Sequence, residues 1–251
     1  MSAGGVIAGR PSAPKTVLVH GLASSYRVWD RVLPKIEPQT ACLAVELASD
    51  GRIEDDADDV AALLDPGRPV VVVGHSRGAL VAAALAERRP DLVSALVLLC
   101  PPWSRDARLS ARSPIERALA IPGIGDLMWS LASDERQRAA QRSAFGPGVN
   151  VPDQFLADAR ARGRRNFVRS SRAIDTYLDA APLPDRLRNL FVPTELVFGE
   201  VDARVAAPAD AFAHLRHVTT AVLPGVGHTP PWEAPVEIAE LITRTARTAS
   251  R

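Results

Sequence analysis

Ser76 lies at the centre of the sequence GHSRG, residues 74–78, which stands between two apolar stretches. The valine run before it, residues 69–74, predicts a buried strand, and the alanine-rich stretch after it, residues 78–89, predicts a helix. The glycines allow a turn too tight for a Cβ atom, which would hold the serine hydroxyl above the carboxyl edge of a sheet. A helix N-terminus beneath that turn would stabilise negative charge. We therefore predict that Ser76 is a nucleophile.

A nucleophilic serine needs a base to accept its proton and an acid to orient that base. Among the five histidines, His228 follows the last predicted strand, in a loop expected at the same sheet edge as Ser76. Asp202 follows the preceding strand and is the predicted acid. Glu200 in the same turn also qualifies chemically, but Asp202 lies further into the loop, where a carboxylate can reach the histidine. The order Ser76, Asp202, His228 matches the order expected for a serine on a strand–turn–helix elbow.

A tetrahedral intermediate also needs hydrogen-bond donors for its oxyanion. The backbone N–H of Arg77 follows the nucleophile and is one predicted donor. The second is the N–H of Leu22, because Gly21 permits a sharp turn after the first strand. His214 and His217 have the spacing of a metal pair, but solvated histidines are the favoured interpretation. We expect no metal and no cofactor.

Short apolar stretches alternate with helical ones, which predicts a parallel sheet covered on both faces, an α/β fold. The predicted strands are residues 15–20, 41–47, 69–74, 92–100, 193–199 and 219–223, and the predicted helices include residues 55–64, 78–89 and 208–215.

Residues 101–192 interrupt this alternation, because they contain little strand signal and apolar residues at helical spacing, such as Leu127 and Leu131. A bare crossover needs only about a dozen residues. We therefore predict a helical lid (cap) over residues 101–192, inserted into a core of residues 1–100 and 193–251.

The composition excludes several classes of protein. Hydrophobic residues make up 47% of the 251 residues, and 30 Lys and Arg against 29 Asp and Glu give a net charge of +1. No global attraction to nucleic acid or to an anionic membrane follows from that balance. Cys42 and Cys100 are too few for a disulfide framework or a four-cysteine zinc site. Without a signal peptide or an apolar run of ~20 residues, we expect a cytoplasmic protein.

These motifs resemble the α/β-hydrolase superfamily, in particular its lidded serine-nucleophile branch of esterases, lactonases, carbon–carbon bond hydrolases and related lyases. The resemblance covers nearly the whole chain and includes the His20-Gly21 loop with Trp29 downstream, and the sequence WEAP at residues 232–235. Trp29 is interpreted as a core residue rather than a substrate contact. It implies the α/β-hydrolase fold. Two departures stand out: residues 5–8 alone could supply an N-terminal strand, and the nucleophile is not the aspartate of haloalkane dehalogenases and epoxide hydrolases. Those two activities are therefore disfavoured.

The resemblance implies a cofactor-free serine hydrolase that cleaves an ester, thioester or lactone of a small acyl substrate through an acyl-enzyme. The alternative is a lyase or carbon–carbon bond-cleaving enzyme that uses His228 as its base. A non-catalytic ligand-binding homologue is a third, disfavoured interpretation, because such a protein has no need of the whole triad. Trp103, Met128 and Trp129 are the candidates for the substrate pocket.

Arginines at three- and four-residue steps predict one basic face on a lid helix, provided that Gly163 does not break it. Asp158 can pair with Arg162 on that face. A solvated surface is the favoured interpretation, and a substrate carboxylate or an acidic carrier protein is the alternative. The stripe consists of Arg162, Arg165, Arg169 and Arg172.

Overall fold

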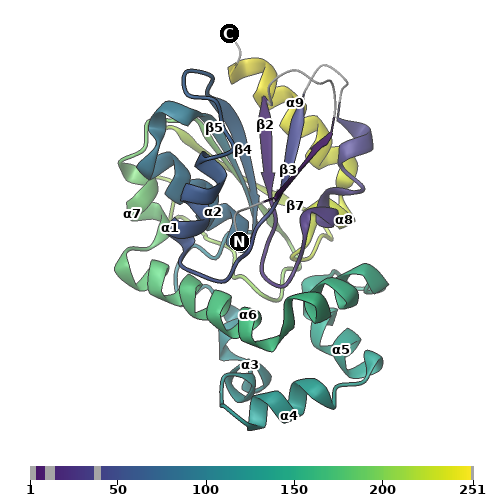
Figure 1. Cartoon of the computed structure of the whole chain (residues 1–251). Helices are drawn as coiled ribbons and strands as arrows, with labels where there is room; N and C mark the ends of the chain where they lie inside the picture. The colour runs from purple at the N-terminus through teal and green to yellow at the C-terminus, as the bar shows by residue number, and fades with distance from the viewer. Residues whose placement is uncertain (1–3, 9–14, 37–40, 250–251) are drawn as a thin grey trace.

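The computed structural model describes residues 4–8, 15–36 and 41–249. Its centre is a seven-stranded sheet with the order β1-β3-β2-β4-β5-β6-β7 (Figure 1). Strands β2 to β7 are parallel, and β1 pairs antiparallel with β3 at the edge. The strands are β1 (Gly4–Ala8), β2 (Thr16–Val19), β3 (Cys42–Glu46), β4 (Val70–His75), β5 (Val93–Leu99), β6 (Thr194–Gly199) and β7 (Val218–Leu223).

All six strands predicted from apolar runs are confirmed, and β1 covers the residues offered as a seventh. Strands β2 and β4 are buried along their whole length, as expected for the middle of a parallel sheet covered on both faces. The helix predicted over residues 208–215 is wrong, because this segment forms successive turns. Ala209 has a φ of +43°, which an α-helix does not accommodate.

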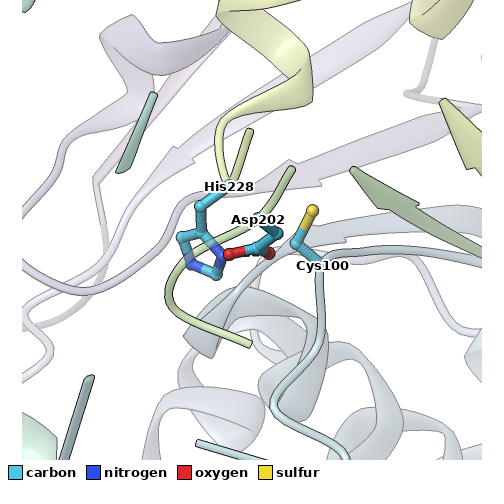
Figure 2. Close-up of side chains that lie close together, drawn as sticks. All are labelled: Cys100, Asp202 and His228. Atoms are coloured by element: carbon cyan, nitrogen blue, oxygen red, sulfur yellow. Dashed lines mark hydrogen bonds and ion pairs between the residues drawn. The ribbon is translucent and has the colours of Figure 1, made fainter. Parts of the chain in front are cut away.

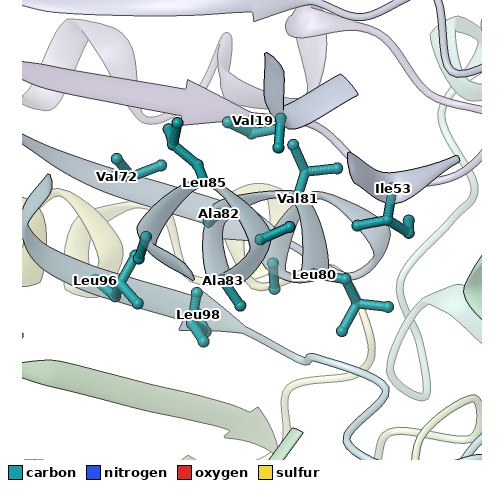
Figure 3. Packing of buried hydrophobic residues seen from close by; sticks show 14 of the residues in the cluster. Val19, Ile53, Val72, Leu80, Val81, Ala82, Ala83, Leu85, Leu96 and Leu98 are labelled. Carbon is teal, nitrogen blue, oxygen red and sulfur yellow. The ribbon is translucent and has the colours of Figure 1, made fainter. Parts of the chain in front are cut away.

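Helices cover the two faces of the sheet (Figure 1). On one face, α2 buries ten of its twelve residues, from Arg77 to Ala86. Leu80 and Leu85 of α2 belong to the same apolar cluster as Val72 and Leu96 of the sheet (Figure 3). Burial of each such side chain contributes about 1.5–3 kcal/mol to stability. The helices on this face are α1 (Ile53–Ala61), α2 (Arg77–Arg88) and α7 (Leu183–Arg188), and those on the other are α8 (Pro230–Glu233) and α9 (Pro235–Ala249).

Residues 101–192 lie between β5 and β6 and are helical, and we call them the insertion. Figure 1 shows α6 between the core and the outer helices α3, α4 and α5. α6 changes direction at Gly163, whose φ of 74° and ψ of 165° are not helical. The last helix of the insertion, α7, contributes Leu183 and Leu187 to the core. The other helices of the insertion are α3 (Pro114–Leu119), α4 (Ile124–Ser130), α5 (Asp134–Gln141) and α6 (Asp153–Ala180).

Short 3₁₀ helices complete the described chain. One of them carries Trp29, which is buried in the core as predicted. Within the described ranges, no helix combines the length and the apolar character needed to cross a bilayer. The 3₁₀ helices are η1 (Tyr26–Trp29), η2 (Leu33–Lys35), η3 (Pro90–Leu92), η4 (Leu109–Arg112) and η5 (Arg142–Ala144).

Candidate active site

Ser76 forms the turn between β4 and α2 with a φ of 53° and a ψ of −115°. A residue with a side chain rarely adopts such a positive φ, so the surrounding structure must hold it there. A Cβ atom on Gly74 would overlap the backbone of Gly78, and one on Gly78 would overlap the backbone of Val19 and His20. Both glycines are therefore needed for the strand and helix to meet behind Ser76, as the sequence predicted.

The structure brings Ser76, His228 and Asp202 together. His228 Nε2 lies 2.9 Å from Ser76 Oγ, and its Nδ1 lies 2.7 Å from Asp202 Oδ2. Figure 2 shows the His228 ring beside the Asp202 carboxylate. With the Nδ1 proton donated to Asp202, Nε2 is free to accept the serine proton. This is the geometry of a nucleophile, a base and an orienting acid.

The side chain of Asp202 is buried and accepts hydrogen bonds on both oxygens. Its Oδ1 accepts the backbone N–H groups of Arg204 at 2.7 Å and of Val205 at 3.0 Å. Burial alone would raise the pKa of Asp202, but the His228 ring and these two N–H groups outweigh it and hold the pKa below its ordinary value. The carboxylate is therefore ionised and can stabilise an imidazolium at His228.

Glu200, the alternative acid, has a different position. Its Oε2 accepts the backbone N–H of Gly225 at 2.8 Å, which orders the loop that leads to His228. The structure therefore places Asp202, rather than Glu200, against the His228 ring.

Glu233 is a residue of this site that the sequence analysis missed. Its carboxylate accepts the N–H groups of Gly227 at 3.2 Å and Thr229 at 3.1 Å, the two neighbours of His228. It also accepts the N–H of Gly146 in the insertion at 2.7 Å. The position of Glu233 five residues after His228 was the available signal, but its contacts depend on the folded loop.

His75 precedes the serine and does not contact its hydroxyl in the structure. Its Nε2 donates to the backbone carbonyl of His228 at 2.7 Å. Burial lowers the pKa of His75 from 6.5 to about 3, so the ring is neutral and carries one proton for this bond. His75 thus supports the backbone of the base.

The two predicted oxyanion donors lie on either side of Ser76. Arg77 is the first residue of α2, so its N–H has no acceptor within the helix. A Cβ atom on Gly21 would lie 3.3 Å from Ser76 Cβ, which shows how closely the loop of Leu22 approaches the elbow. Leu22 and Ser76 line the same pocket. Their roles as donors stay a prediction.

A pocket open to solvent is lined by Ser76. Its walls come from loops at the sheet edge and from the insertion. The core side includes Leu22, Ala23, Ser24, Ser76, His228 and Thr229, and the insertion side includes Pro102, Arg108, Ser110, Gln141, Ala144, Phe155 and Ile174.

The substrate contacts predicted at Trp103, Met128 and Trp129 are not among the residues that line this pocket. Trp103 packs edge-on against Phe212, and its indole N–H donates to the Ala206 carbonyl at 2.8 Å. Met128 and Trp129 lie on α4, one of the outer helices. The contacts with Phe212 and Ala206 hold the Trp103 ring outside the pocket lining, and the sequence did not reveal these two contacts.

The predicted arginine stripe is not one continuous helical face, because Gly163 interrupts α6. Arg162 reaches loops of the core, and Arg169 pairs with Asp50 at 3.0 Å. Arg165 and Arg172 are exposed.

The ion pair predicted between Asp158 and Arg162 is also wrong. Asp158 pairs with Arg27 at 2.5 Å and accepts the Ser25 hydroxyl at 2.7 Å. These partners lie after β2, so they were distant in sequence.

Cys100, Asp202 and His228 have potential metal-ligand atoms within 4.8 Å of one another (Figure 2). Burial raises the pKa of the Cys100 thiol well above its ordinary value, so it carries no thiolate. Asp202 and His228 already bond to each other, and His228 also contacts Ser76. The cluster therefore fits an acid–base pair with a thiol behind it better than a metal centre. His217, half of the other metal candidate, lies 2.9 Å from the Leu187 carbonyl.

Comparison with known proteins decides the family. A family model described as "Alpha/beta hydrolase family" matches residues 16–241. The chain belongs to the α/β-hydrolase family. A pimeloyl-[acyl-carrier protein] methyl ester esterase of Neisseria meningitidis serogroup C is 31% identical over 220 residues, 83% of each chain. Lipase LipV of Mycobacterium tuberculosis is 40% identical over 127 residues, 46% of this chain and 48% of that one.

Solved structures share the α/β-hydrolase fold over nearly the whole chain. A haloalkane dehalogenase from Bradyrhizobium elkani has a TM-score of 0.80 at 21% identity, covering 99% of this chain and 94% of that one. An esterase from Thermogutta terrifontis has a TM-score of 0.71 at 20% identity, with the same two coverages. The resemblance inferred from the motifs is thus confirmed, and the esterase and lipase relatives support an ester hydrolase on this scaffold.

Proposed function

We propose that this protein is a serine hydrolase that cleaves an ester, thioester or lactone of a small acyl substrate through an acyl-enzyme on Ser76. The observation that carries the proposal is the unbroken contact from Ser76 Oγ through the His228 ring to Asp202, at the wall of a pocket. The site does not depend on a cofactor for this chemistry.

The reaction follows from these positions. Ser76 Oγ attacks the acyl carbon while His228 Nε2 takes the serine proton. The N–H groups of Leu22 and Arg77 stabilise the oxyanion. Collapse of the intermediate breaks the bond to the leaving alcohol or thiol, which receives the proton from His228. A water that gives its proton to His228 then attacks the acyl group and regenerates Ser76.

The insertion acts as a lid in this proposal. Gln141, Phe155 and Ile174 belong to the insertion and line the pocket together with loops of the core. Such a covering segment supplies much of the specificity of a pocket. We therefore assign the choice of acyl group to residues 101–192.

Labelling with a fluorophosphonate and turnover of p-nitrophenyl esters of increasing chain length test this function. We expect stoichiometric labelling, turnover of short esters, and loss of both in Ser76→Ala. Turnover near the wild-type rate in a folded Ser76→Ala would refute the acyl-enzyme. Labelling without turnover of any ester would favour the alternative, a lyase or carbon–carbon bond-cleaving enzyme with His228 as its base.

We propose, more specifically, that the acyl group of the substrate is carried by an acidic protein. The names of the Neisseria relatives include an acyl-carrier protein, and Arg165, Arg169 and Arg172 are exposed on α6. Arg165→Glu should then slow turnover of a carrier-bound ester and leave a free ester unaffected. If Arg165→Glu cleaves the carrier-bound ester and the free ester at the wild-type rates, these arginines are a solvated surface. A cytoplasmic location stays part of the proposal.

A further inference from the structure

Arg162 of the insertion reaches into the core immediately before the break at Gly163. Its side chain is 13% exposed, and its partners lie on the segments that follow β2 and end β3. An arginine has five N–H donors in a fixed plane, and here all five have an acceptor. They are the carbonyls of Ser24 (3.1 Å), Leu47 (2.5 Å) and Ala48 (3.2 Å), the Glu46 carboxylate, and His20 Nε2 (3.1 Å).

Two contacts fix where the ring proton of His20 lies. His20 Nε2 accepts from Arg162 and also from the backbone N–H of Leu47 at 3.0 Å, so this nitrogen is unprotonated. Burial, and after it the charge of Arg162, lower the pKa of His20 to about 3, so the ring is neutral. Its single proton is therefore on Nδ1.

His20 Nδ1 lies 2.9 Å from the Gly21 carbonyl. That carbonyl belongs to the peptide group whose other end is the N–H of Leu22, the predicted oxyanion donor. A hydrogen bond to the carbonyl orients the peptide plane and polarises the N–H, since linked hydrogen bonds strengthen one another. The ring thus acts on the donor through one peptide bond.

The same arginine holds the other side of Leu22. Ala23 has a φ of +53°, a conformation that persists only where the surroundings hold it. Arg162 Nε donates to the carbonyl of Ser24, the next residue. Arg162 therefore fixes the loop before Leu22 through His20 and after Leu22 directly.

We propose that Arg162 is a positioning residue for the oxyanion hole, so that the Leu22 N–H is aimed at the substrate only while α6 lies against the sheet edge. The proposal rests on the serine-hydrolase function proposed above. It makes the insertion part of the catalytic geometry as well as the wall of the pocket. An enzyme with α6 displaced would keep its triad and lose an oxyanion donor.

Steady-state kinetics of Arg162→Met, which keeps side-chain length without N–H groups, test this role. Removing an oxyanion donor costs about 10²–10³ in kcat, and misaiming one should cost less, about 10- to 100-fold. We expect that loss in kcat, a KM within a few-fold of wild type, and a matching loss of affinity for an alkyl boronic acid, which forms a tetrahedral adduct on Ser76. Arg160→Met is the control, because Arg160 pairs with Asp134 inside the insertion. It should match wild type.

Two further measurements separate positioning from a merely structural role. Guanidinium ion should restore part of the activity of Arg162→Ala and have no such effect on Arg160→Ala. ¹⁵N NMR of the imidazoles should show the Nδ1–H form of His20 in the wild type and a displaced Nε2 resonance in Arg162→Met, because Nε2 then keeps the Leu47 N–H and loses its second donor. If the methionine variant does not fold, Arg162→Lys replaces it in the kinetics and in the NMR measurement. One ammonium group cannot donate to all five acceptors.

A folded Arg162→Met with wild-type kcat would overturn the proposal. A variant that loses activity while its affinity for the boronic acid and its His20 ¹⁵N resonances stay unchanged would overturn it too. A wild-type protein that cleaves no ester, thioester or lactone would instead refute the proposed function, and the NMR measurement would still decide whether Arg162 donates to the His20 ring.

Discussion

Helices α2 and α4 both carry apolar residues at helical spacing, yet they lie in opposite environments. α2 buries ten of its twelve residues against the sheet, whereas in α4 Gly125 is the buried residue and Leu127 is 60% exposed. Charged contacts hold the outer helices instead. Arg164 pairs with Asp126 at 2.6 Å and donates to the Leu119 carbonyl at 2.9 Å. Apolar periodicity therefore indicates a helix, but the burial of its apolar face depends on tertiary neighbours.

The residues of the site also come from these two regions, the core and the insertion. Ser76, Asp202 and His228 stand on strand ends and loops of the core. The insertion adds pocket walls and polar contacts, such as Arg162 at the oxyanion loop and Gly146 at Glu233. In the proposed mechanism, the core supplies the chemical groups, and the insertion supplies orientation and selection.

Asp202→Asn tests the contribution of the core to catalysis and has the largest expected effect. An amide in place of the carboxylate favours the wrong imidazole tautomer and should lower kcat on the order of 10⁴-fold. Glu200→Gln is the matched control and should change kcat little, because Gln can still accept the Gly225 N–H. The reverse pattern in ester kinetics would make Glu200 the acid.

Hydrogen–deuterium exchange tests the contrast between α2 and α4 directly. Helices with few buried apolar contacts open at low free energy, whereas core helices open near the global unfolding free energy. We expect amides of α4 to exchange on the order of 10³ times faster than those of α2, measured by mass spectrometry of peptides. Equal protection of the two helices would show that the outer insertion is as stable as the core.

Gly163→Ala tests the contribution of the insertion to catalysis. A φ of 74° with a ψ of 165° is a region essentially restricted to glycine, and forcing a side chain there costs about 1–3 kcal/mol. The change should displace Arg162 and lower kcat about tenfold.

Gly148→Ala is the control for that variant, because Gly148 also has a positive φ, 83°, and open space around it. It should lower the melting temperature without the loss in kcat. If the two variants lose activity equally, the direction of α6 does not govern the site.

His75 provides a test on the dependence of stability on pH rather than on activity. Its pKa is lowered to about 3 in the fold and is 6.5 as the ordinary value. Between these values the unfolded chain binds the proton and the folded chain does not, so stability falls as pH decreases from 6.5 toward 3. The loss is about 1.4 kcal/mol per pH unit at most.

His75→Gln keeps an N–H donor for the His228 carbonyl but does not titrate. Urea unfolding between pH 4.5 and 7 should therefore show a shallower slope in this variant than in the wild type. The buried His20 would retain its own contribution. An unchanged slope would mean that His75 is not protected from protonation.

The sequence predicted best what local pattern determines. The valine run of β4 and the glycines around Ser76 act over a few residues, and the predicted order of Ser76, Asp202 and His228 followed from strand ends meeting at one edge. Tertiary contacts decided the rest. Trp103 packs against Phe212, Asp158 pairs with Arg27, and Arg162 contacts core loops next to the break in α6 at Gly163. Partners so distant in sequence leave no local signal.

The most direct test of the central claim is a rapid-quench measurement of a p-nitrophenyl ester reaction, followed by mass spectrometry of the quenched protein. The account predicts a burst of one p-nitrophenol per enzyme molecule and one acyl group, mapped to the peptide that contains Ser76. Deacylation should be slower than acylation for the burst to appear, which an ester with an activated leaving group favours. Ester turnover with no acyl group on Ser76 at any quench time would contradict the account.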